Sequence, residues 1–349
     1  FPPMLISPTT WLVFTFGLLT STLITLSSHN WLLVWLGLEL NTMSMLPIII
    51  KSQHPRSTEA TTKYFLVQTT AAALVLLGGL LNTWQTGQWT ITYTTPEATL
   101  ILTLALLLKL GLPPGHFWYP EVLQGTTLAT ALIISTWQKL IPLSILYMIL
   151  QQPLMNMLTL GLFAALLGGW LGLNQTQTRK LLAFSSIAHM GWLVTALTLD
   201  AKLVTITLMI YIFATTTVFT SFSLTTTKTI TDLAPTHASY PTLTATLLLV
   251  MMSLGGLPPL SGFLPKWAIL NNLISKDLLL IAILLALASL PNLYFYTRMT
   301  YVTALTSPPA TSTIKHTWRF TPTFPSSLTI LSLLSTLLLP ISHTLIGTT

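Results

Sequence analysis

Long runs of apolar residues, separated by short polar stretches, divide the chain into segments of helical length. A helix needs about 20 mostly apolar residues to cross a bilayer core about 30 Å thick. Uninterrupted spans are predicted near residues 9–26, 31–50, 60–81, 132–150, 154–173, 181–199, 203–224, 278–296 and 328–345. These runs lack the short alternating pattern of membrane β-strands. The pattern therefore predicts an all-α, polytopic membrane protein.

Two further apolar segments, starting near residues 98 and 243, are interrupted by consecutive prolines. The first breaks at Gly111-Leu-Pro-Pro-Gly115 and the second at Gly255-Gly-Leu-Pro-Pro259, and half-helices resume near Glu121 and Pro265. Proline has no backbone N–H and clashes with the preceding turn, so a continuous helix is not expected at either place. Counting each broken segment as one crossing gives about 11 transmembrane helices.

The two breaks share a spacing that indicates an internal repeat. Gly111 and Pro120 are nine positions apart, as are Gly256 and Pro265. Five predicted crossings separate the starts of the two broken segments, and an odd offset means that the copies run in opposite senses. In inverted repeats of this kind, paired broken helices mark the ion or substrate pathway; Pro-Pro pairs also occur in ordinary loops. We expect one transmembrane domain over residues 1–349, with inverted five-helix repeats at about 9–150 and 154–300 and an extra helix at about 325–346.

The composition supports a lipid environment. Only 6% of the residues are charged and 52% are hydrophobic, whereas soluble domains carry roughly 25% charged residues. The chain has no cysteine, which excludes disulfides, a thiol nucleophile and iron–sulfur ligation by thiolates of this chain. No signal peptide is apparent, because the first apolar stretch lacks a basic leader and a small-residue cleavage site.

The net charge of +7 does not come from a dense basic run, which argues against nucleic-acid binding. Membrane topology explains the basic residues better. If the N-terminus defines one side, that side holds Lys51, Arg56, Arg179, Lys180, Lys228, Arg298, Lys315 and Arg319, and the other side holds only Lys202 and Lys276. Positive residues are enriched on the cytoplasmic or matrix side. The N-terminus is therefore expected there and the C-terminus on the opposite face.

Four ionisable residues lie in or beside apolar runs: Glu39, Lys109, Lys139 and Lys266. A charge at the centre of a membrane helix costs roughly 2.5 to 3.5 kcal/mol on insertion scales, so such residues usually have a function. Two structural explanations remain open. Lys266, close to a helix end, can extend its ammonium to the interface, and Glu39 with Lys109 can form a static ion pair.

The functional interpretation is a proton relay. Desolvation lowers the pKa of a lysine and a neighbouring carboxylate raises it, so a charge that moves nearby switches the lysine between holding and releasing a proton. His116 and Glu121, just after the first break, are further relay candidates. His189 is interpreted as a packed polar residue. The sequence shows no metal-ligand spacing, P-loop, dinucleotide fingerprint or haem motif.

Four stretches of the chain resemble a known family. The stretches Trp35–Pro47, Lys109–Gly125, Gly172–Gly191 and Gly256–Trp267 are similar to the signatures of the NADH dehydrogenase subunit 2 family. That family belongs to the antiporter-like subunits of respiratory complex I, which are related to cation/proton antiporter subunits. The length and about 11 spans look like the animal mitochondrial form, which lacks three N-terminal helices of bacterial relatives.

The resemblance implies proton translocation driven by quinone reduction elsewhere in the complex. In the family a glutamate–lysine pair, a central lysine and a terminal lysine lie along a polar axis at mid-membrane. By motif these correspond to Glu39 with Lys109, to Lys139 and to Lys266. The chain would be a multi-pass protein of the mitochondrial inner membrane, with its N-terminus in the matrix and its C-terminus in the intermembrane space.

The resemblance also implies the partners of this chain and where the cofactors bind. FMN, the iron–sulfur clusters and ubiquinone are expected to bind elsewhere in the complex, so this chain would be a subunit of H⁺-translocating NADH:ubiquinone reductase without cofactor, metal or redox centre of its own. The expected partners are other membrane-arm subunits, including neighbouring antiporter-like subunits and small accessory subunits, together with lipids such as cardiolipin on the basic matrix side. No nucleic acid is expected.

Two other functions fit parts of the pattern. A stand-alone cation/proton antiporter would share the architecture, but would not co-migrate with flavin and iron–sulfur subunits. A structural membrane scaffold would use its buried charges only to hold helices together, and would tolerate lysine-to-methionine changes.

Overall fold

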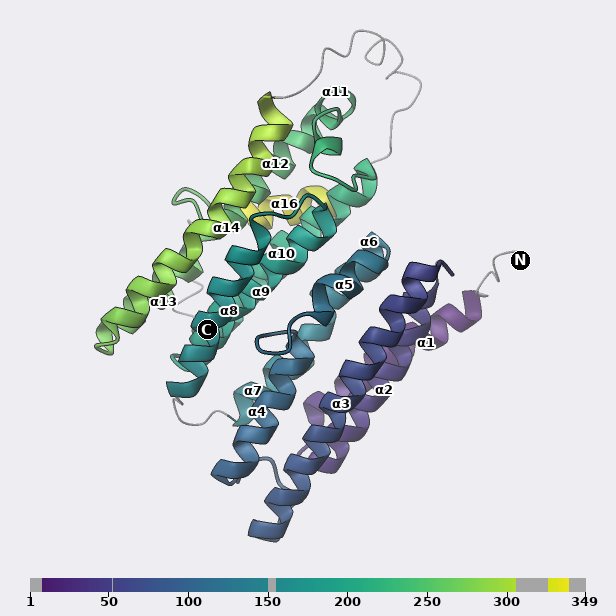
Figure 1. The fold of residues 1–349 in the computed structure, drawn as a ribbon, viewed down its shortest axis with the longest axis vertical. Helices are drawn as coiled ribbons and strands as arrows, with labels where there is room; N and C mark the ends of the chain where they lie inside the picture. The colour runs from purple at the N-terminus through teal and green to yellow at the C-terminus, as the bar shows by residue number, and fades with distance from the viewer. Residues whose placement is uncertain (1–7, 52, 150–154, 306–325, 339–349) are drawn as a thin grey trace. The chain divides into compact units, whose positions relative to one another are not determined.

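The computed structural model describes residues 8–51, 53–149, 155–305 and 326–338 (Figure 1). Within these ranges every regular element is a helix, and extended pairing is limited to two isolated bridges, Asn30–Thr90 and Gln177–Thr229. Eight of the described helices, with α6 and α7 taken as one, are long and apolar enough to cross a membrane. The all-α membrane fold predicted from the sequence is confirmed.

The chain divides into two compact units, residues 1–152 and 153–349. In the first unit α1 packs against α2, α2 and α4 pack against α3, and α7 packs against α4. Its helices are α1 (Pro8–Ser27), α2 (Trp31–Ile50), α3 (Pro55–Thr86), α4 (Pro96–Leu110), α5 (Trp118–Gly125), α6 (Leu128–Ser135) and α7 (Trp137–Ile149).

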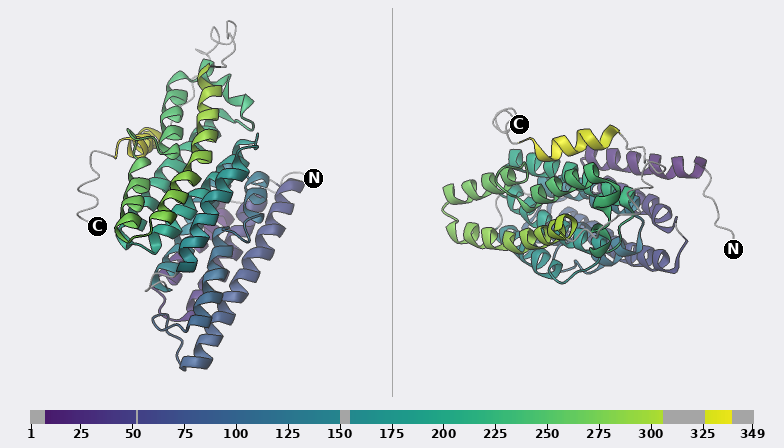
Figure 2. Two further views of the ribbon diagram at one scale, coloured as in Figure 1. Left: turned by 60° about the vertical axis from the view of Figure 1, so that its left-hand side comes forward. Right: turned by 90° about the horizontal axis from the view of Figure 1, so that it is seen from above.

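In the second unit α8 packs against α9 and α14, while α10 and α14 both pack against α12 (Figures 1 and 2). A short last helix, α16, lies against α10 and α12. The elements are α8 (Met155–Gly172), α9 (Thr178–Leu197), α10 (Ala201–Thr225), η1 (Thr231–Leu233), α11 (Thr236–Ser239), α12 (Pro241–Gly255), α13 (Phe263–Ser275), α14 (Leu279–Leu305) and α16 (Ser326–Thr336).

Both predicted breaks are present, and both use the same backbone motif. Helix α4 ends at Gly111 with φ of +72°, and α12 ends at Gly256 with φ of +85°. In each case the next residue reaches back five positions: the N–H of Leu112 donates to the carbonyl oxygen of Leu107 at 3.0 Å, and that of Leu257 to the carbonyl oxygen of Met252 at 3.4 Å. This is the Schellman ending, for which glycine is favoured because the left-handed conformation is open to it without strain.

Most expected helix ends lie within about three residues of those observed, but α3 extends to Thr86 rather than 81, α6 begins at Leu128 rather than 132, and α14 extends to Leu305 rather than 296. Helix α3 begins at Pro55 rather than near residue 60, because His54 and Ser57 form a capping box and proline is favoured in the first turn. The half-helix α5 begins at Trp118, three residues before Glu121. Helix ends depend on these local caps, which apolar patterning does not register.

The span expected over residues 132–150 is interrupted at Thr136, which separates α6 from α7. The carbonyl oxygen of Leu132 accepts three hydrogen bonds there: from the N–H and the hydroxyl of Thr136, at 3.0 and 2.7 Å, and from the hydroxyl of Ser135 at 3.0 Å. Hydroxyls that bond back to the preceding turn bend helices, which accounts for the irregularity.

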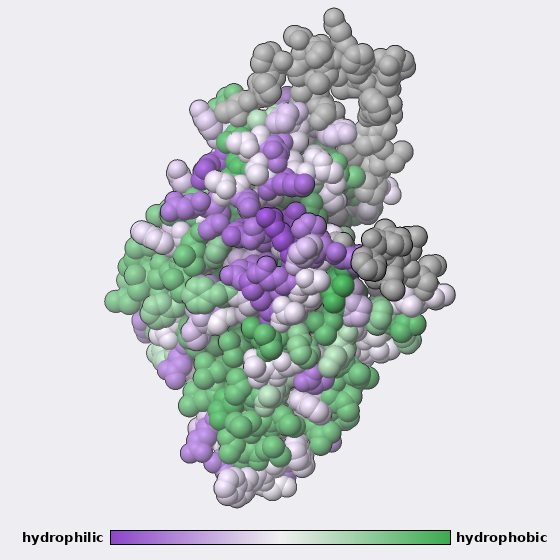
Figure 3. All heavy atoms as spheres, turned by 45° about the vertical axis from the view of Figure 1, so that its right-hand side comes forward, coloured by the Kyte–Doolittle hydropathy of each residue, from purple (hydrophilic) through white to green (hydrophobic). Residues whose placement is uncertain are grey.

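Hydrophobic side chains cover much of the face of the molecule seen in Figure 3. Large apolar residues such as Phe16, Leu66 and Trp170 are exposed on the helices, as expected for surfaces that meet lipid or other membrane subunits. The end of the predicted last span, together with Lys315 and Arg319, lies outside the described residues. The count of about 11 crossings therefore stays a prediction.

Candidate functional site

Two of the four ionisable residues that the sequence places in or beside apolar runs face one cavity in the first unit. Lys109, in the last turn of α4, and Lys139, in the first turn of α7, both line a cavity of about 20 Å³, measured as the space open to the centre of a water molecule. A cavity needs about 10 to 15 Å³ on this measure to hold one water. The other lining side chains are Leu38, Asn41, Thr42, Tyr64, Gln68, Leu110, Trp118, Tyr119, Ile134, Gln138 and Pro142.

Lys109 is only 7% exposed, and in the described residues no hydrogen-bond acceptor lies within 3.5 Å of its ammonium group. Its backbone carbonyl accepts from the amide of Gln68 at 3.5 Å. Glu39, on α2, interacts with Lys109 electrostatically. The two do not form an ion pair within 4 Å in the described part of the chain. The hydroxyl of Thr42, which lines the cavity, lies 3.3 Å from the Glu39 carboxylate.

Lys139 is 3% exposed and is placed by the interruption at Thr136, whose carbonyl accepts from the Lys139 N–H at 3.3 Å. Its Nζ lies 5.1 Å from the centre of the Tyr119 ring, within the range of a cation–π interaction. The residue before it, Gln138, forms a reciprocal pair of amide hydrogen bonds with Asn41 at 2.8 and 3.0 Å. Two lysines, three amides and the Tyr119 ring are thus among the groups that surround space for one or two water molecules.

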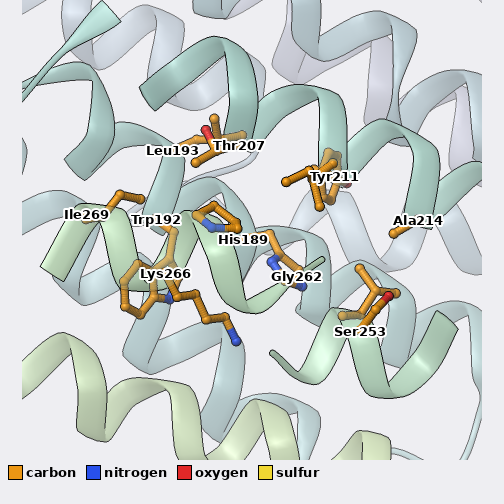
Figure 4. A pocket seen from close by; sticks show the side chains of 13 residues that line it. His189, Trp192, Leu193, Thr207, Tyr211, Ala214, Ser253, Gly262, Lys266 and Ile269 are labelled. Carbon is orange, nitrogen blue, oxygen red and sulfur yellow. The ribbon is translucent and has the colours of Figure 1, made fainter. Parts of the chain in front are cut away.

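Lys266 faces a second cavity, of about 30 Å³, that lies within the second unit (Figure 4). It is 8% exposed, and its ammonium donates to the carbonyl oxygen of Gly255 at 2.8 Å. That carbonyl is left open by the break after α12, and the C-terminal end of a helix favours a cation. His189, Tyr211 and Ser253 are among the side chains around the cavity.

The other sequence candidates lie outside both cavities. His116 is buried after the first break, and both of its ring nitrogens are without a hydrogen-bond partner among the described residues. The carboxylate of Glu121 points instead to Lys63 of α3, at 2.6 Å, and Lys63 also contacts Glu59 at 2.5 Å. Lys109 and Lys139 line the same cavity. Glu39 does not line it, but its carboxylate accepts a hydrogen bond from the hydroxyl of Thr42, which does.

Sequence reasoning missed the neutral polar residues of the first cavity. Asn41, Gln138 and Gln68 lie in or beside predicted spans, but the site predicted from the sequence contains only ionisable residues. The signal that could have identified them is an amide within an apolar span, because burying an amide costs free energy unless it has a hydrogen-bond partner. His189, interpreted as a packed residue, lines the cavity of Lys266. The described residues contain no cluster of three or more metal-ligating side chains of the His, Cys, Asp or Glu type.

Comparison with family models gives two matches that cover most of the chain. A model described as "NADH:quinone oxidoreductase/Mrp antiporter, TM" matches residues 28–290, and one described as "NADH dehydrogenase subunit 2 C-terminus" matches residues 293–346. Similar curated proteins are named NADH-ubiquinone oxidoreductase chain 2. The one from Struthio camelus is 48% identical over 93% of this chain and 95% of its own length, and the one from Xenopus laevis 47% over 96% and 98%.

Solved structures share the fold. The chain is similar to one in respiratory complex I from Thermus thermophilus with bound aureothin, with a TM-score of 0.82 and 24% identity over 97% of this chain and 77% of that one. A chain of the Mrp complex from Dietzia sp. gives a TM-score of 0.77 and 17% identity over 83% and 59%. At these identities the likeness concerns the fold alone.

Proposed function

Because this chain belongs to the NADH:quinone oxidoreductase/Mrp antiporter transmembrane family, we propose that it is a membrane-arm subunit of NADH:ubiquinone oxidoreductase that takes part in proton translocation. Its near full-length similarity to relatives named NADH-ubiquinone oxidoreductase chain 2 supports this assignment. The proposal places it in the mitochondrial inner membrane as a subunit of an enzyme whose electron carriers bind to other chains. The matrix side for the N-terminus follows from the basic loops.

The observation that carries the proton function is that each broken helix brings a lysine to a water-sized cavity. Lysine can take up and release a proton, and a charge that arrives nearby changes the balance between the two forms. In the first unit, Glu39 supplies such a charge, Lys109 and Lys139 hold protons on the shared cavity, and Lys266 does so in the second unit. His116 is the remaining candidate, because a buried imidazole without a partner is available to a water chain.

This function requires the two breaks. An intact helix would satisfy the Gly255 carbonyl within its own backbone, and Lys266 would lose its acceptor. The inverted repeat proposed from the sequence agrees with the shared Schellman endings, since both units use one backbone device. Partner surfaces for neighbouring membrane-arm subunits are part of the same proposal, as are lipids on the basic side.

The test uses the assembled complex in inner-membrane vesicles that carry Lys109→Met. Proton pumping and NADH:quinone turnover are measured together, and assembly is checked on a native gel. Loss of both activities from an assembled complex is the expected result. Lys63→Met is the matched control, because Lys63 is an exposed lysine of the same unit. Full pumping per electron in Lys109→Met would show that Lys109 is structural.

A stand-alone cation/proton antiporter is the second candidate, since the family description includes Mrp antiporters and a chain of an Mrp complex shares the fold. Purification from native membranes separates the two. Co-migration with flavin and iron–sulfur subunits supports the first function, and its absence together with sodium-dependent proton exchange supports the second.

A further inference from the structure

The amide pair between α2 and α7 has no role in the function proposed above. Asn41 donates to the side-chain oxygen of Gln138 at 2.8 Å, and Gln138 donates back at 3.0 Å. Asn41 is 4% exposed. Both amides line the cavity that Lys109 and Lys139 share. A fully paired interhelical link at this place needs a reason, because two apolar side chains would also fill the space.

The pair joins two helices that share little other packing. The main neighbours of α7 are α4, α6 and α1, and those of α2 are α1 and α3. Gln138 directly precedes Lys139, and Asn41 follows Glu39 by two positions. The link therefore fixes the helix that carries Lys139 against the helix that carries Glu39, at the level of the cavity.

The chemistry of amides limits what the pair does. An amide donates and accepts hydrogen bonds but does not take up a proton near neutral pH, so it is not itself a relay. After the reciprocal bonds are made, each amide keeps one N–H and one oxygen lone pair. These groups are fixed dipoles next to a space of about 20 Å³, which holds one water or two.

We propose that Asn41 and Gln138 are positioning residues: their amide bridge orients the cavity water through which Lys109 and Lys139 exchange a proton. In that step the ammonium of one lysine gives a proton to the water oxygen, and the water gives one of its own protons to the neutral amine of the other. The water is left unchanged and no net charge stays on it. This inference rests on the proposed proton function.

Three variants of the assembled complex test the bridge: Gln138→Met, Asn41→Leu, and the swap Asn41→Gln with Gln138→Asn, which keeps two amides of the same combined length. Pumping, NADH:quinone turnover and the ratio of turnover in H₂O to that in D₂O are measured. Each single variant is expected to slow pumping and turnover roughly tenfold, since a misplacement of about 1 Å can cost up to about 10²-fold. The isotope ratio should rise, because proton transfer becomes rate-limiting, and the swap should regain much of the rate.

Gln85→Met is the matched control: Gln85 also bonds through its side-chain amide, to Glu97 at 2.7 Å, but outside the cavity. Parent rates in an assembled Gln138→Met complex would overturn the proposal, as would slow rates with an unchanged isotope ratio. If a single variant fails to assemble, the swap variant provides the test. A swap complex that assembles like the parent but turns over slowly with an unchanged isotope ratio would reject the positioning role of the two amides. Lys109→Met is measured in parallel. If it still pumps fully per electron, Lys109 is structural and the proton exchange between Lys109 and Lys139 is wrong, whatever the amide variants do.

Discussion

The two units build their breaks with the same backbone device but fill them with different side chains. Gly111 and Gly256 end their helices in the left-handed conformation with matching hydrogen bonds. In the first unit the lysine, Lys109, precedes the glycine by two positions, and the carbonyl of Leu108 accepts from the N–H of Gly111 at 3.1 Å and from the indole of Trp118 at 3.2 Å. In the second unit Lys266 follows the glycine by ten positions and donates to a freed carbonyl itself.

The residues that stand at the same distance after the two glycines also differ between the units. Ten residues after the glycine, the first unit has Glu121, whose carboxylate pairs with Lys63 away from the cavity, and the second has buried Lys266. Five residues after it, the first has His116, whose ring nitrogens lack a hydrogen-bond partner in the described residues, and the second has Ser261, which bonds to backbone carbonyls near the end of α16. The backbone break is thus the common element, and the position of the charge within it is free to vary.

The largest expected difference is between the residues that stand ten positions after each break glycine, Lys266 in the second unit and Glu121 in the first. Lys266→Met should lower turnover and pumping by about tenfold or more, as is typical when a positioned proton-transfer group is removed. Glu121→Gln should leave most of the activity, because an exposed ion pair contributes only about 0 to 1 kcal/mol. Both are measured in assembled complexes. Equal losses would show that the two breaks work alike despite their different side chains.

The next effect concerns the break glycines. Gly111→Ala and Gly256→Ala should each cost about 1 to 2 kcal/mol, because L-residues are strained in the left-handed region. The added Cβ of Gly256→Ala would lie 2.7 Å from the Lys266 ammonium, so turnover should fall as well. Gly87→Ala is the control: its φ is +73° and its Cβ would meet open space. Thermal inactivation reports the strain. An unaltered turnover in Gly256→Ala would contradict the tight fit around Lys266.

Smaller effects on stability, of opposite sign in the two units, are expected five positions after each break glycine. Ser261→Ala removes the hydroxyl bond to the Ser335 carbonyl and should cost about 1 kcal/mol of stability. His116→Leu should cost little or even stabilise, since it removes a buried polar group that has no partner among the described residues. Thermal inactivation of both variants is compared with that of the parent complex. Greater destabilisation by His116→Leu than by Ser261→Ala would contradict this ranking and show that the His116 ring contributes to stability.

The smallest effect is a pH dependence in the loop of the second unit. The N–H groups of Thr229 and Lys228 donate to the Asp232 carboxylate, and they hold the pKa of Asp232 below its ordinary value of 3.8. A lowered pKa in the folded state stabilises the loop above that value, and the stabilisation is lost as the pH falls through the lowered pKa. Hydrogen exchange of residues 226–233 in the parent and in Asp232→Asn should therefore differ at pH 7 and converge at low pH.

Most helices were predictable because each needs only a run of apolar residues bounded by a polar turn, and the breaks followed from glycine and proline. The interruption at Thr136 was not predicted, since it depends on three donors sharing the Leu132 carbonyl. The four ionisable candidates could be selected because placing a charge in an apolar span is expensive. Their surroundings could not: Asn41 and Gln138 are 97 positions apart, and neutral amides leave no periodic signal. Whether these residues carry protons stays a prediction.

The small size of the two lysine cavities bears on which ion can pass. A water molecule in the liquid occupies about 30 Å³, so spaces open to one or two water centres exclude a sodium ion that keeps several waters around it. A bare sodium ion would meet a lysine side chain in each cavity, and no carboxylate lines either cavity to offset the repulsion from its ammonium form. A proton needs no vacant volume, because it advances by exchange of covalent and hydrogen bonds. The packing around the lysines is therefore suited to proton transfer and not to the passage of a hydrated sodium ion.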